Sequence, residues 1–130
     1  MAETRDSAIP APQKHFLVIE DDDDSREAFC ALIQITGNDA VGVENGARAL
    51  DYLRSHSAPS AILLDMRMPI MDGWEFRQIQ CSDPELRGIP VLVISAEDRF
   101  RAQTLASGVA GFISKPIDPE ELIGALEVLA

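Results

Sequence analysis

Five polar residues of this 130-residue chain stand at the ends of short apolar runs: Glu20, Asp21, Asp65, Ser95 and Lys115. Three carboxylates brought together repel one another, so that they raise their pKa values or recruit a cation. Oxygen ligands without a neighbouring histidine or cysteine favour a hard ion, of which Mg²⁺ is the usual one. A carboxylate beside Mg²⁺, with a lysine and a hydroxyl aimed at the same point, is equipped to attack a phosphoryl group in line.

Each of these residues also has an ordinary explanation. Acidic runs such as residues 20–24 are usually solvated loops, a lysine before a proline is usually on the surface, and Ser95 could simply cap a helix. Asp65 could open a turn, as aspartate often does after a strand. The chemical interpretation gains weight because the polar residues follow four different apolar segments.

Strands and helices are expected to alternate along the chain. Continuous apolar runs predict buried strands, and apolar residues at helical spacing predict amphipathic helices. The expected strands are residues 16–19, 40–43, 61–64, 89–94 and 111–114, and the expected helices are residues 25–35, 47–54, 74–81, 99–106 and 119–129. Asp24 and Glu27 form a capping box for the first helix, and Asp118 is the expected N-cap of the last.

This alternation predicts an α/β fold of the (βα)5 type, with a parallel sheet and helices on both faces. Of the common doubly wound strand orders, five strands fit 2-1-3-4-5. The polar residues then converge on the edge where open α/β sheets bind ligands. The first and third helices lie on opposite faces, so Cys30 and Cys81 are expected to be separate, buried thiols.

Length and composition exclude several classes of protein. The chain is expected to form one domain, with residues 1–14 as a flexible tail and residues 15–130 as the folded part. A net charge of −11 argues against a nucleic-acid partner. No apolar run is long enough to span a membrane, and residues 1–13 lack the apolar core of a signal peptide. The expected location is therefore the cytoplasm.

Four motifs resemble the receiver domain of two-component response regulators. They are L-V-I-E-D-D, L-L-D-M-R-M-P-I-M-D-G, V-I-S-A and F-I-S-K-P, and the resemblance covers residues 16–129. The separations agree as well, with 44 residues from Asp21 to Asp65, 30 from Asp65 to Ser95 and 20 from Ser95 to Lys115. The resemblance implies the flavodoxin-like receiver fold, whose strand order is 2-1-3-4-5.

The resemblance also implies how the acidic residues are used. Asp65 is the expected phosphoacceptor, which becomes an aspartyl phosphate. Asp21 is expected to ligate Mg²⁺ (or Mn²⁺) directly, with Glu20 as the second acidic position, acting through water. Asp65 itself and the backbone carbonyl of Arg67 would complete the protein's share of the metal ligands. Glu20 stands where an aspartate is commoner in the family.

Three further residues have roles implied by the resemblance. Ser95 is the expected switch hydroxyl, in a position where threonine is commoner. Lys115 is expected to pair with the phosphoryl group, and the resemblance suggests a cis peptide bond between Lys115 and Pro116. Phe112 stands where the family keeps an aromatic switch residue. Because it lacks the hydroxyl of a tyrosine, its switching is expected to be steric.

The implied function is a phosphorylation switch. A histidine kinase or histidine phosphotransfer protein would supply the phosphoryl group, and a protein target would read the face of the fourth helix, fifth strand and fifth helix. Arg67 and Glu97 are expected to form a gate that slows hydrolysis of the phosphoryl group. Such a protein is a signalling phosphoacceptor rather than a conventional enzyme, although it catalyses its own phosphoryl transfer and slow self-dephosphorylation.

Alternatives to this interpretation remain. The chain ends at Ala130 with its last helix, which favours a stand-alone receiver over one cut from a hybrid histidine kinase or a larger response regulator. A haloacid-dehalogenase-type phosphatase would have a second aspartate two residues after the nucleophile, where this chain has Arg67. A flavodoxin-like enzyme would need a glycine-rich phosphate loop after the first strand, and none follows.

Overall fold

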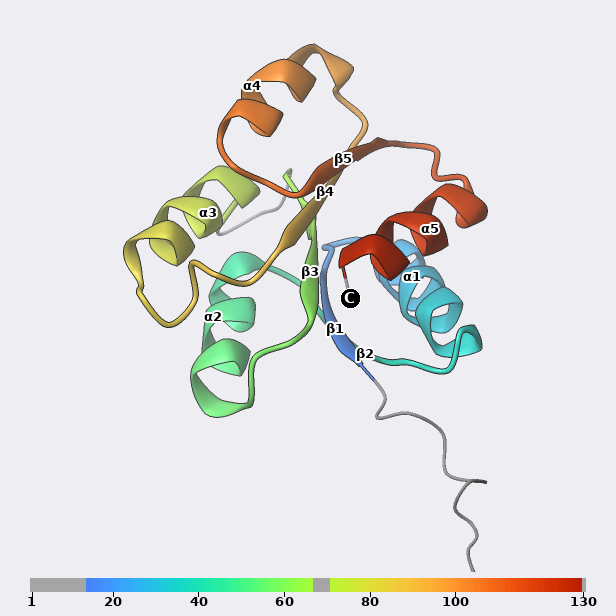
Figure 1. Cartoon of the computed structure of the whole chain (residues 1–130), viewed down its shortest axis with the longest axis horizontal. Coiled ribbons are helices and arrows are strands. Elements are labelled where there is room, and N and C mark those ends of the chain that lie inside the picture. The colour runs from blue at the N-terminus through green and yellow to red at the C-terminus, as the bar shows by residue number, and fades with distance from the viewer. Residues whose placement is uncertain (1–13, 67–70, 130) are drawn as a thin grey trace, which may run out of the picture.

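The computed structural model describes residues 14–66 and 71–129 (Figure 1). Its strands are β1 (His15–Ile19), β2 (Asp39–Val43), β3 (Ala61–Asp65), β4 (Val91–Ser95) and β5 (Gly111–Ser114). Its helices are α1 (Asp23–Ile35), α2 (Gly46–Ser55), α3 (Gly73–Ser82), α4 (Arg101–Ala106) and α5 (Pro119–Leu129), and a 3-10 turn, η2 (Asp98–Phe100), precedes α4. The predicted (βα)5 alternation is confirmed.

The five strands form one parallel sheet in the order β2-β1-β3-β4-β5, which is the predicted order. The register pairs Ile19 of β1 with Leu64 of β3, and Asp65 at the end of β3 with Ile94 of β4. The carboxyl ends of β1, β3 and β4 therefore meet at one edge of the sheet. Glu20, which follows Ile19, is at the level of Asp65.

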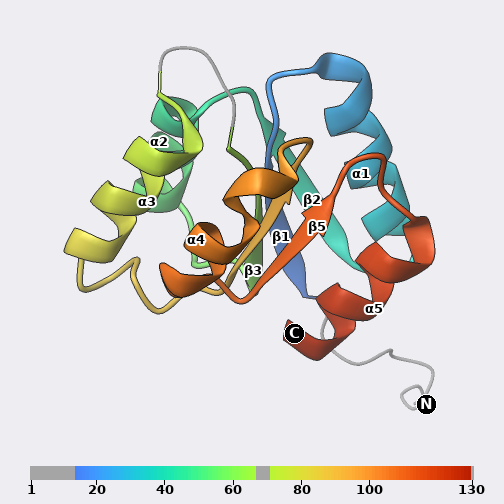
Figure 2. The ribbon, with the colours of Figure 1, turned by 90° about the horizontal axis from the view of Figure 1, so that it is seen from above.

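Both faces of the sheet are buried, as the continuous apolar runs predict. Figures 1 and 2 show α1 and α5 on one face and α2, α3 and α4 on the other. The core under α1 and α5 includes Phe16, Val18, Leu63, Ile94 and Leu122, and the core under α2 and α3 includes Leu17, Ile19, Leu64, Phe76 and Phe112. Because successive strand residues face opposite sides, the central strands β1, β3 and β4 need apolar residues on both faces, whereas the edge strand β2 is partly exposed.

The first helix begins earlier than the sequence predicted, and its cap is a different residue. Asp22 is the N-cap: its backbone is extended, and its side chain accepts a hydrogen bond from the Ser25 N–H at 2.8 Å. The predicted capping box of Asp24 and Glu27 is wrong, because Asp24 already lies inside α1. In a run of five acidic residues, the residue that caps is the one whose backbone is not yet helical.

Most other boundaries lie within one residue of the prediction, and two segments differ by more. β4 begins at Val91 rather than residue 89, because the Ile89 N–H is used in a turn, where it donates to the Leu86 carbonyl at 3.1 Å. The predicted helix 99–106 is divided into η2 and the six-residue α4. At the end of the chain the prediction is confirmed, since the Asp118 carboxylate accepts from the Glu120 N–H at 3.0 Å.

The two cysteines are not bonded to each other, as expected from their places on opposite faces of the sheet. Cys30 on α1 is partly buried, whereas Cys81 on α3 is exposed. The expectation that both thiols are buried is therefore wrong for Cys81. The inward side of α3 carries Phe76, Arg77 and Gln80, which leaves Cys81 on the outer side.

The predicted tail, residues 1–14, falls outside the described residues except for Lys14, whose carbonyl accepts from the Asp39 N–H at 2.9 Å. The Lys115–Pro116 peptide bond is cis, as the sequence led us to expect. No helix within residues 14–66 and 71–129 is long and apolar enough to cross a bilayer.

Candidate functional site

Three carboxylates meet at the carboxyl edge of the sheet. Glu20 follows β1, Asp21 comes next, and Asp65 ends β3. One carboxylate oxygen from each residue lies within 4.8 Å of the others. Glu20 and Asp65 are almost completely buried, with 1% and 6% of their surface exposed, whereas Asp21 is exposed. The arrangement predicted from the strand ends is therefore present, and it is open to solvent on the side of Asp21.

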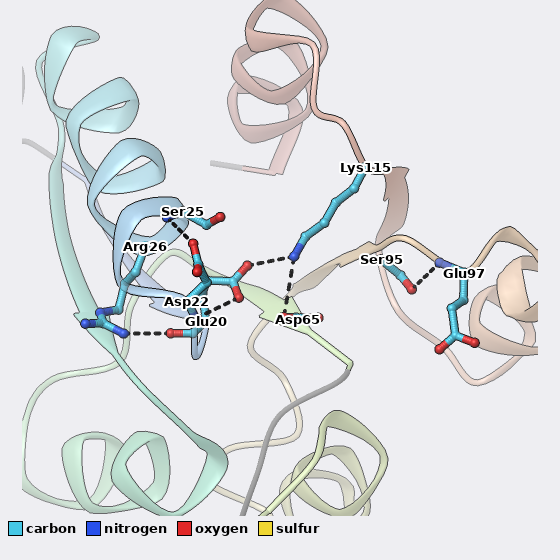
Figure 3. Close-up of polar contacts among 8 residues, drawn as sticks. All are labelled: Glu20, Asp22, Ser25, Arg26, Asp65, Ser95, Glu97 and Lys115. Atoms are coloured by element: carbon cyan, nitrogen blue, oxygen red, sulfur yellow. Dashed lines mark hydrogen bonds and ion pairs between the residues drawn. The ribbon is translucent and has the colours of Figure 1, made fainter.

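Glu20 is held by three groups. Its Oε1 accepts from the Lys115 Nζ at 3.0 Å, and its Oε2 accepts from the Asp22 N–H at 3.2 Å. Its backbone carbonyl accepts from the Arg26 guanidinium at 2.9 Å (Figure 3). A buried carboxylate needs such partners, because burial without them is costly. The first turn of α1 therefore fixes the orientation of Glu20 toward the site.

Lys115 connects β5 to both neighbouring carboxylates. Figure 3 shows its side chain reaching from the end of β5 toward Glu20 and Asp65. The ammonium lies 3.0 Å from Glu20 Oε1 and 3.5 Å from Asp65 Oδ2. Burial alone would lower the pKa of Lys115, but the hydrogen bond to Glu20 and the charges of Asp65 and Glu20 raise it above its ordinary value. Lys115 is therefore a permanent cation at the site.

Among the described residues, Lys115 is the cation in contact with Glu20 and Asp65, and one lysine does not neutralise three carboxylates. The pKa of Glu20 is raised above its ordinary value, first by burial and then by its contact with Asp65, and Lys115 offsets this only in part. The pKa of the exposed Asp21 is also raised, by partial desolvation of its carboxylate and by the neighbouring Glu20. Raised carboxyl pKa values at adjacent residues indicate a deficit of positive charge. The cluster thus favours an additional cation.

The donor set fits a hard divalent cation. The three clustered ligand groups are all carboxylates, without histidine or cysteine, and such oxygen sites suit Mg²⁺ or Mn²⁺. The exposure of Asp21 leaves room for the waters that Mg²⁺ usually keeps. The backbone carbonyl of Arg67, expected as a further ligand, lies outside the described residues.

Ser95 ends β4 beside this cluster and is buried. Its hydroxyl accepts a hydrogen bond from the Glu97 N–H at 3.0 Å, and Figure 3 shows it turned toward Glu97. Its carbonyl accepts from the Lys115 N–H at 2.9 Å, which joins the ends of β4 and β5. Ser95 thus lies at the site edge but is engaged by the loop that leads to η2.

Phe112 lies on β5, opposite Val93 of β4, and is 5% exposed. Its ring packs in the core under α2 and α3, and the Arg101 guanidinium lies 5.2 Å from the ring centroid. Glu97, the described half of the predicted gate, forms an ion pair with Arg99 at 2.9 Å. The other half, the side chain of Arg67, lies outside the described residues.

Sequence reasoning missed three residues that shape the site: Asp22, Arg26 and Gly73. Asp22 and Arg26 hold Glu20, and the spacing of Asp22 from Ser25 was the available signal for the cap. Gly73 begins α3 against the end of β3, and a Cβ there would lie 2.6 Å from the Met66 Cα. An Asp–Gly pair such as Asp72–Gly73 is typical of a turn, but this close approach appears only in the folded chain.

Comparisons with known proteins agree with this geometry. The family model for the response regulator receiver domain matches residues 16–127. The polar-differentiation response regulator DivK of Brucella anthropi is 32% identical over 120 residues, which cover 88% of this chain and 94% of that protein. The receiver domain of a signal transduction histidine kinase from Syntrophus aciditrophicus is 29% identical, with a TM-score of 0.81 and coverage of 89% of each chain.

A third similarity concerns the fold alone. The receiver domain of the sensor histidine kinase PA1611 from Pseudomonas aeruginosa superposes with a TM-score of 0.82 at 22% identity, and covers 91% of this chain and 98% of that domain. The structure of that protein has a magnesium ion coordinated in its active-site cleft.

Proposed function

Because the chain belongs to the response regulator receiver domain family, we propose that Asp65 accepts a phosphoryl group from a histidine kinase or a histidine phosphotransfer protein. The observation that carries this proposal is the contact of one ammonium with two buried carboxylates. Lys115 lies 3.0 Å from Glu20 and 3.5 Å from Asp65, in a cluster whose remaining carboxylate, Asp21, faces solvent. A donor can therefore approach Asp65 from the open side.

The residues of the site divide the work of phosphoryl transfer. A carboxylate oxygen of Asp65 attacks the phosphorus of the donor's phosphohistidine in line: the O–P bond of the aspartyl phosphate forms as the N–P bond breaks, and the donor's imidazole leaves. Lys115 neutralises charge on the equatorial oxygens, and its ion pair with Glu20 keeps its ammonium beside Asp65. Glu20, Asp21 and Asp65 would hold Mg²⁺ or Mn²⁺, with the carbonyl of Arg67 as the further ligand. When bound, the ion supplies positive charge to the same oxygens.

The response of the protein is a change at the face formed by α4, β5 and α5. The Ser95 hydroxyl donates to a phosphoryl oxygen on Asp65, which draws it inward and away from the Glu97 N–H. Phe112, which packs on β5 beside Val93, moves toward the space that Ser95 leaves. A protein target that binds one arrangement of this face more tightly shifts the population toward it.

The experiment that tests the phosphoacceptor is incubation with acetyl phosphate and Mg²⁺, followed by intact mass spectrometry. Wild type is expected to gain one phosphoryl group, and Asp65→Asn none. Asp51→Asn, at an exposed position on α2, is the matched control and is expected to behave as wild type. Incorporation that persists in Asp65→Asn would contradict the assignment, and incorporation that persists in EDTA would contradict the need for a metal.

A gate of Arg67 and Glu97 over the phosphoryl group is a separate part of the proposal. Glu97 already pairs with Arg99 at 2.9 Å, so Arg67 would share this carboxylate. Arg67→Ala is expected to speed self-dephosphorylation, because it clears the path of the attacking water. Hydrolysis rates that agree within about twofold would count against the gate, since a 1.4 kcal/mol barrier already changes a rate about tenfold.

The proposal places the protein in the cytoplasm, in a pathway that signals through protein contacts. DivK, a response regulator of similar length, favours a receiver that acts by itself. The Syntrophus domain favours a second candidate, a receiver attached to a histidine kinase. Both candidates use the same chemistry at Asp65, and neither is a conventional enzyme with an external substrate.

A further inference from the structure

The segment formed by η2 and α4 has few stabilising contacts of its own. Neither element has a side-chain hydrogen bond at its N-cap, and α4 has only six residues. Within α4 only Thr104 is buried, and its hydroxyl has no hydrogen-bond partner in the described structure. A helix this short is unstable alone. The position of α4 therefore depends on side chains from other elements.

Arg77 of α3 is one such side chain. It is 9% exposed, and its guanidinium donates to the carbonyl of Ser107, directly after α4, at 3.1 Å. The same guanidinium donates to Gln80 Oε1 at 2.8 Å. Gln80 is completely buried and is itself fixed, because its amide donates to the carbonyls of Leu86 and Ile89 at 3.0 Å each. Arg77 thus links the end of α4 to a rigid part of α3.

Stability alone explains this arrangement poorly. Arg77 forms no ion pair with a carboxylate within residues 14–66 and 71–129, and its Nε is buried without a partner. Burying an unpaired charge is costly, and an apolar side chain of similar size often serves a core better. What the guanidinium provides, and an apolar residue would not, is a directed contact to the Ser107 carbonyl at the C-terminal end of α4.

The opposite end of the segment is held by β5. The hydroxyl of Ser114, the last residue of β5, donates to the carboxylate of Asp98, the first residue of η2. The same β4–η2 loop supplies the Glu97 N–H that engages Ser95 at 3.0 Å. The orientation of Ser95 and the position of α4 therefore belong to one connected arrangement, tied at one end by Ser114 and at the other by Arg77.

We propose that Arg77 is a positioning residue for the output face: by holding the end of α4, it favours the arrangement in which Ser95 engages Glu97. This inference rests on the proposed function. A contact made in one of two arrangements lowers the population of the other. In the other arrangement Ser95 has left Glu97, and this is the one that accepts phosphoryl groups readily. Removal of the Arg77 contact increases the population of this arrangement, and the rate of phosphorylation rises in proportion.

Two measurements on Arg77→Met test the proposal: amide hydrogen exchange of residues 101–106, and the rate of phosphorylation by acetyl phosphate with Mg²⁺. We expect exchange in α4 to rise about tenfold while α1 and α5 keep their protection, since local opening is independent of global unfolding. We expect phosphorylation to be about threefold faster or more. Arg77→Lys keeps the charge but cannot donate to Gln80 and Ser107 at the same time in the way the guanidinium does. Its exchange and phosphorylation rates are expected to lie between those of wild type and Arg77→Met.

Arg87→Met is the matched control, because Arg87 is exposed in the loop after α3, and it is expected to behave as wild type in both assays. Exchange in α4 within about twofold of wild type would overturn the proposal, as would a uniform loss of protection over α3 and α4. An unchanged phosphorylation rate would also overturn it. If Arg77→Met does not fold, the comparison of Arg77→Lys with Arg87→Met decides in the same way.

The exchange measurement separates this proposal from the proposed function. If wild type takes no phosphoryl group from acetyl phosphate, the assignment of Asp65 fails, and the exchange data still decide whether Arg77 positions α4. If wild type is phosphorylated but α4 is unaffected by Arg77→Met, the assignment of Asp65 stands and the positioning role fails.

Discussion

The two sides of the site are built differently. On the side of β1, α1 has 13 residues and is preceded by Asp22, whose side chain caps the helix at the Ser25 N–H. The same first turn binds Glu20 through the Asp22 N–H and the Arg26 guanidinium. On the side of β4, α4 has six residues and no side-chain cap. The side that would hold the metal is stabilised by its own helix, whereas the side that would respond depends on contacts from α3 and β5.

This difference suits the proposed division of labour. A phosphoryl-transfer site works best when its charged groups are fixed before the reaction, because no energy is then spent on reorientation. A face that reports phosphorylation must instead have two arrangements of similar free energy. The free energy of local opening differs from one part of a protein to another, and the elements that move in a switch are among those with the lowest values. The measurements below test whether these two sides differ as the structure indicates.

The largest expected effect is that of Asp65→Asn. This change should abolish phosphoryl incorporation, weaken Mg²⁺ binding and leave the fold intact. The metal-free protein should become more stable by about 0.5–2 kcal/mol, because one of three clustered carboxylates is removed. Urea denaturation without metal measures the change. A lower midpoint than wild type would show that Asp65 contributes structural hydrogen bonds that outweigh the repulsion.

The second prediction concerns pH and uses Glu20. Its pKa is raised above the ordinary value of 4.5, mainly by burial, so the Glu20 carboxyl binds a proton more tightly in the folded chain than in the unfolded chain. The resulting stabilisation of the metal-free protein is full below the ordinary pKa and is lost as the pH rises from there through the raised pKa. One such proton changes the free energy of unfolding by up to about 1.4 kcal/mol per pH unit.

Urea midpoints measured without metal between about pH 4 and 8, for wild type and Glu20→Gln, isolate this group. The urea midpoint of wild type should fall relative to that of Glu20→Gln as the pH rises, and saturating Mg²⁺ should restore the wild-type midpoint at neutral pH. A wild-type midpoint that rises relative to that of Glu20→Gln with pH in the absence of metal would mean that Lys115 and the Asp22 N–H more than compensate the buried charge.

The third prediction concerns the cap of α1. Asp22→Ala should lower the urea midpoint, because the Ser25 N–H loses its acceptor. Asp22→Asn should largely preserve the midpoint, since an amide oxygen accepts the same hydrogen bond. Asp24→Ala is the matched control inside the helix and should have little effect. If Asp24→Ala were the more damaging change, the cap predicted from the sequence would be the correct one after all.

These residues also show what the sequence could and could not predict. The strands were predictable because a strand buried on both faces requires a continuous apolar run, as in residues 61–64. Their order was predicted from the common doubly wound orders and from the resemblance to receiver domains. The site was predictable because its residues end those strands. The choice of Asp22 over Asp24 was not, since several adjacent carboxylates can cap equally well and the backbone path decides.

The role of Arg77 could not be predicted either. In the sequence, Arg77 is one charged residue in a helix, and such residues usually face solvent. Its burial depends on the Ser107 carbonyl, 30 residues away, and on the inward amide of Gln80. The same dependence on tertiary structure explains the error for Cys81, which faces outward because Phe76, Arg77 and Gln80 occupy the inner side of α3. Local patterns do not contain such long-range contacts.

The smallest expected effect is that of Ser114→Ala, and it sharpens the contrast most directly. The change removes the hydroxyl that donates to Asp98 and takes no other described side-chain hydrogen bond from the protein. Asp98 is exposed, so water can replace the lost donor, and the urea midpoint should stay within about 0.5 kcal/mol of wild type.

Amide exchange should nevertheless change near the mutation. Because η2 has no side-chain cap of its own, exchange of residues 98–100 should rise severalfold while α1 keeps its protection. Ser82→Ala is the matched control: the Ser82 hydroxyl donates to the Gln78 carbonyl on the exposed side of α3, so exchange in η2 should not change. A fall in global stability without local exchange in η2 would mean that the β4 side is as firmly integrated as the β1 side, and the contrast between them would be lost.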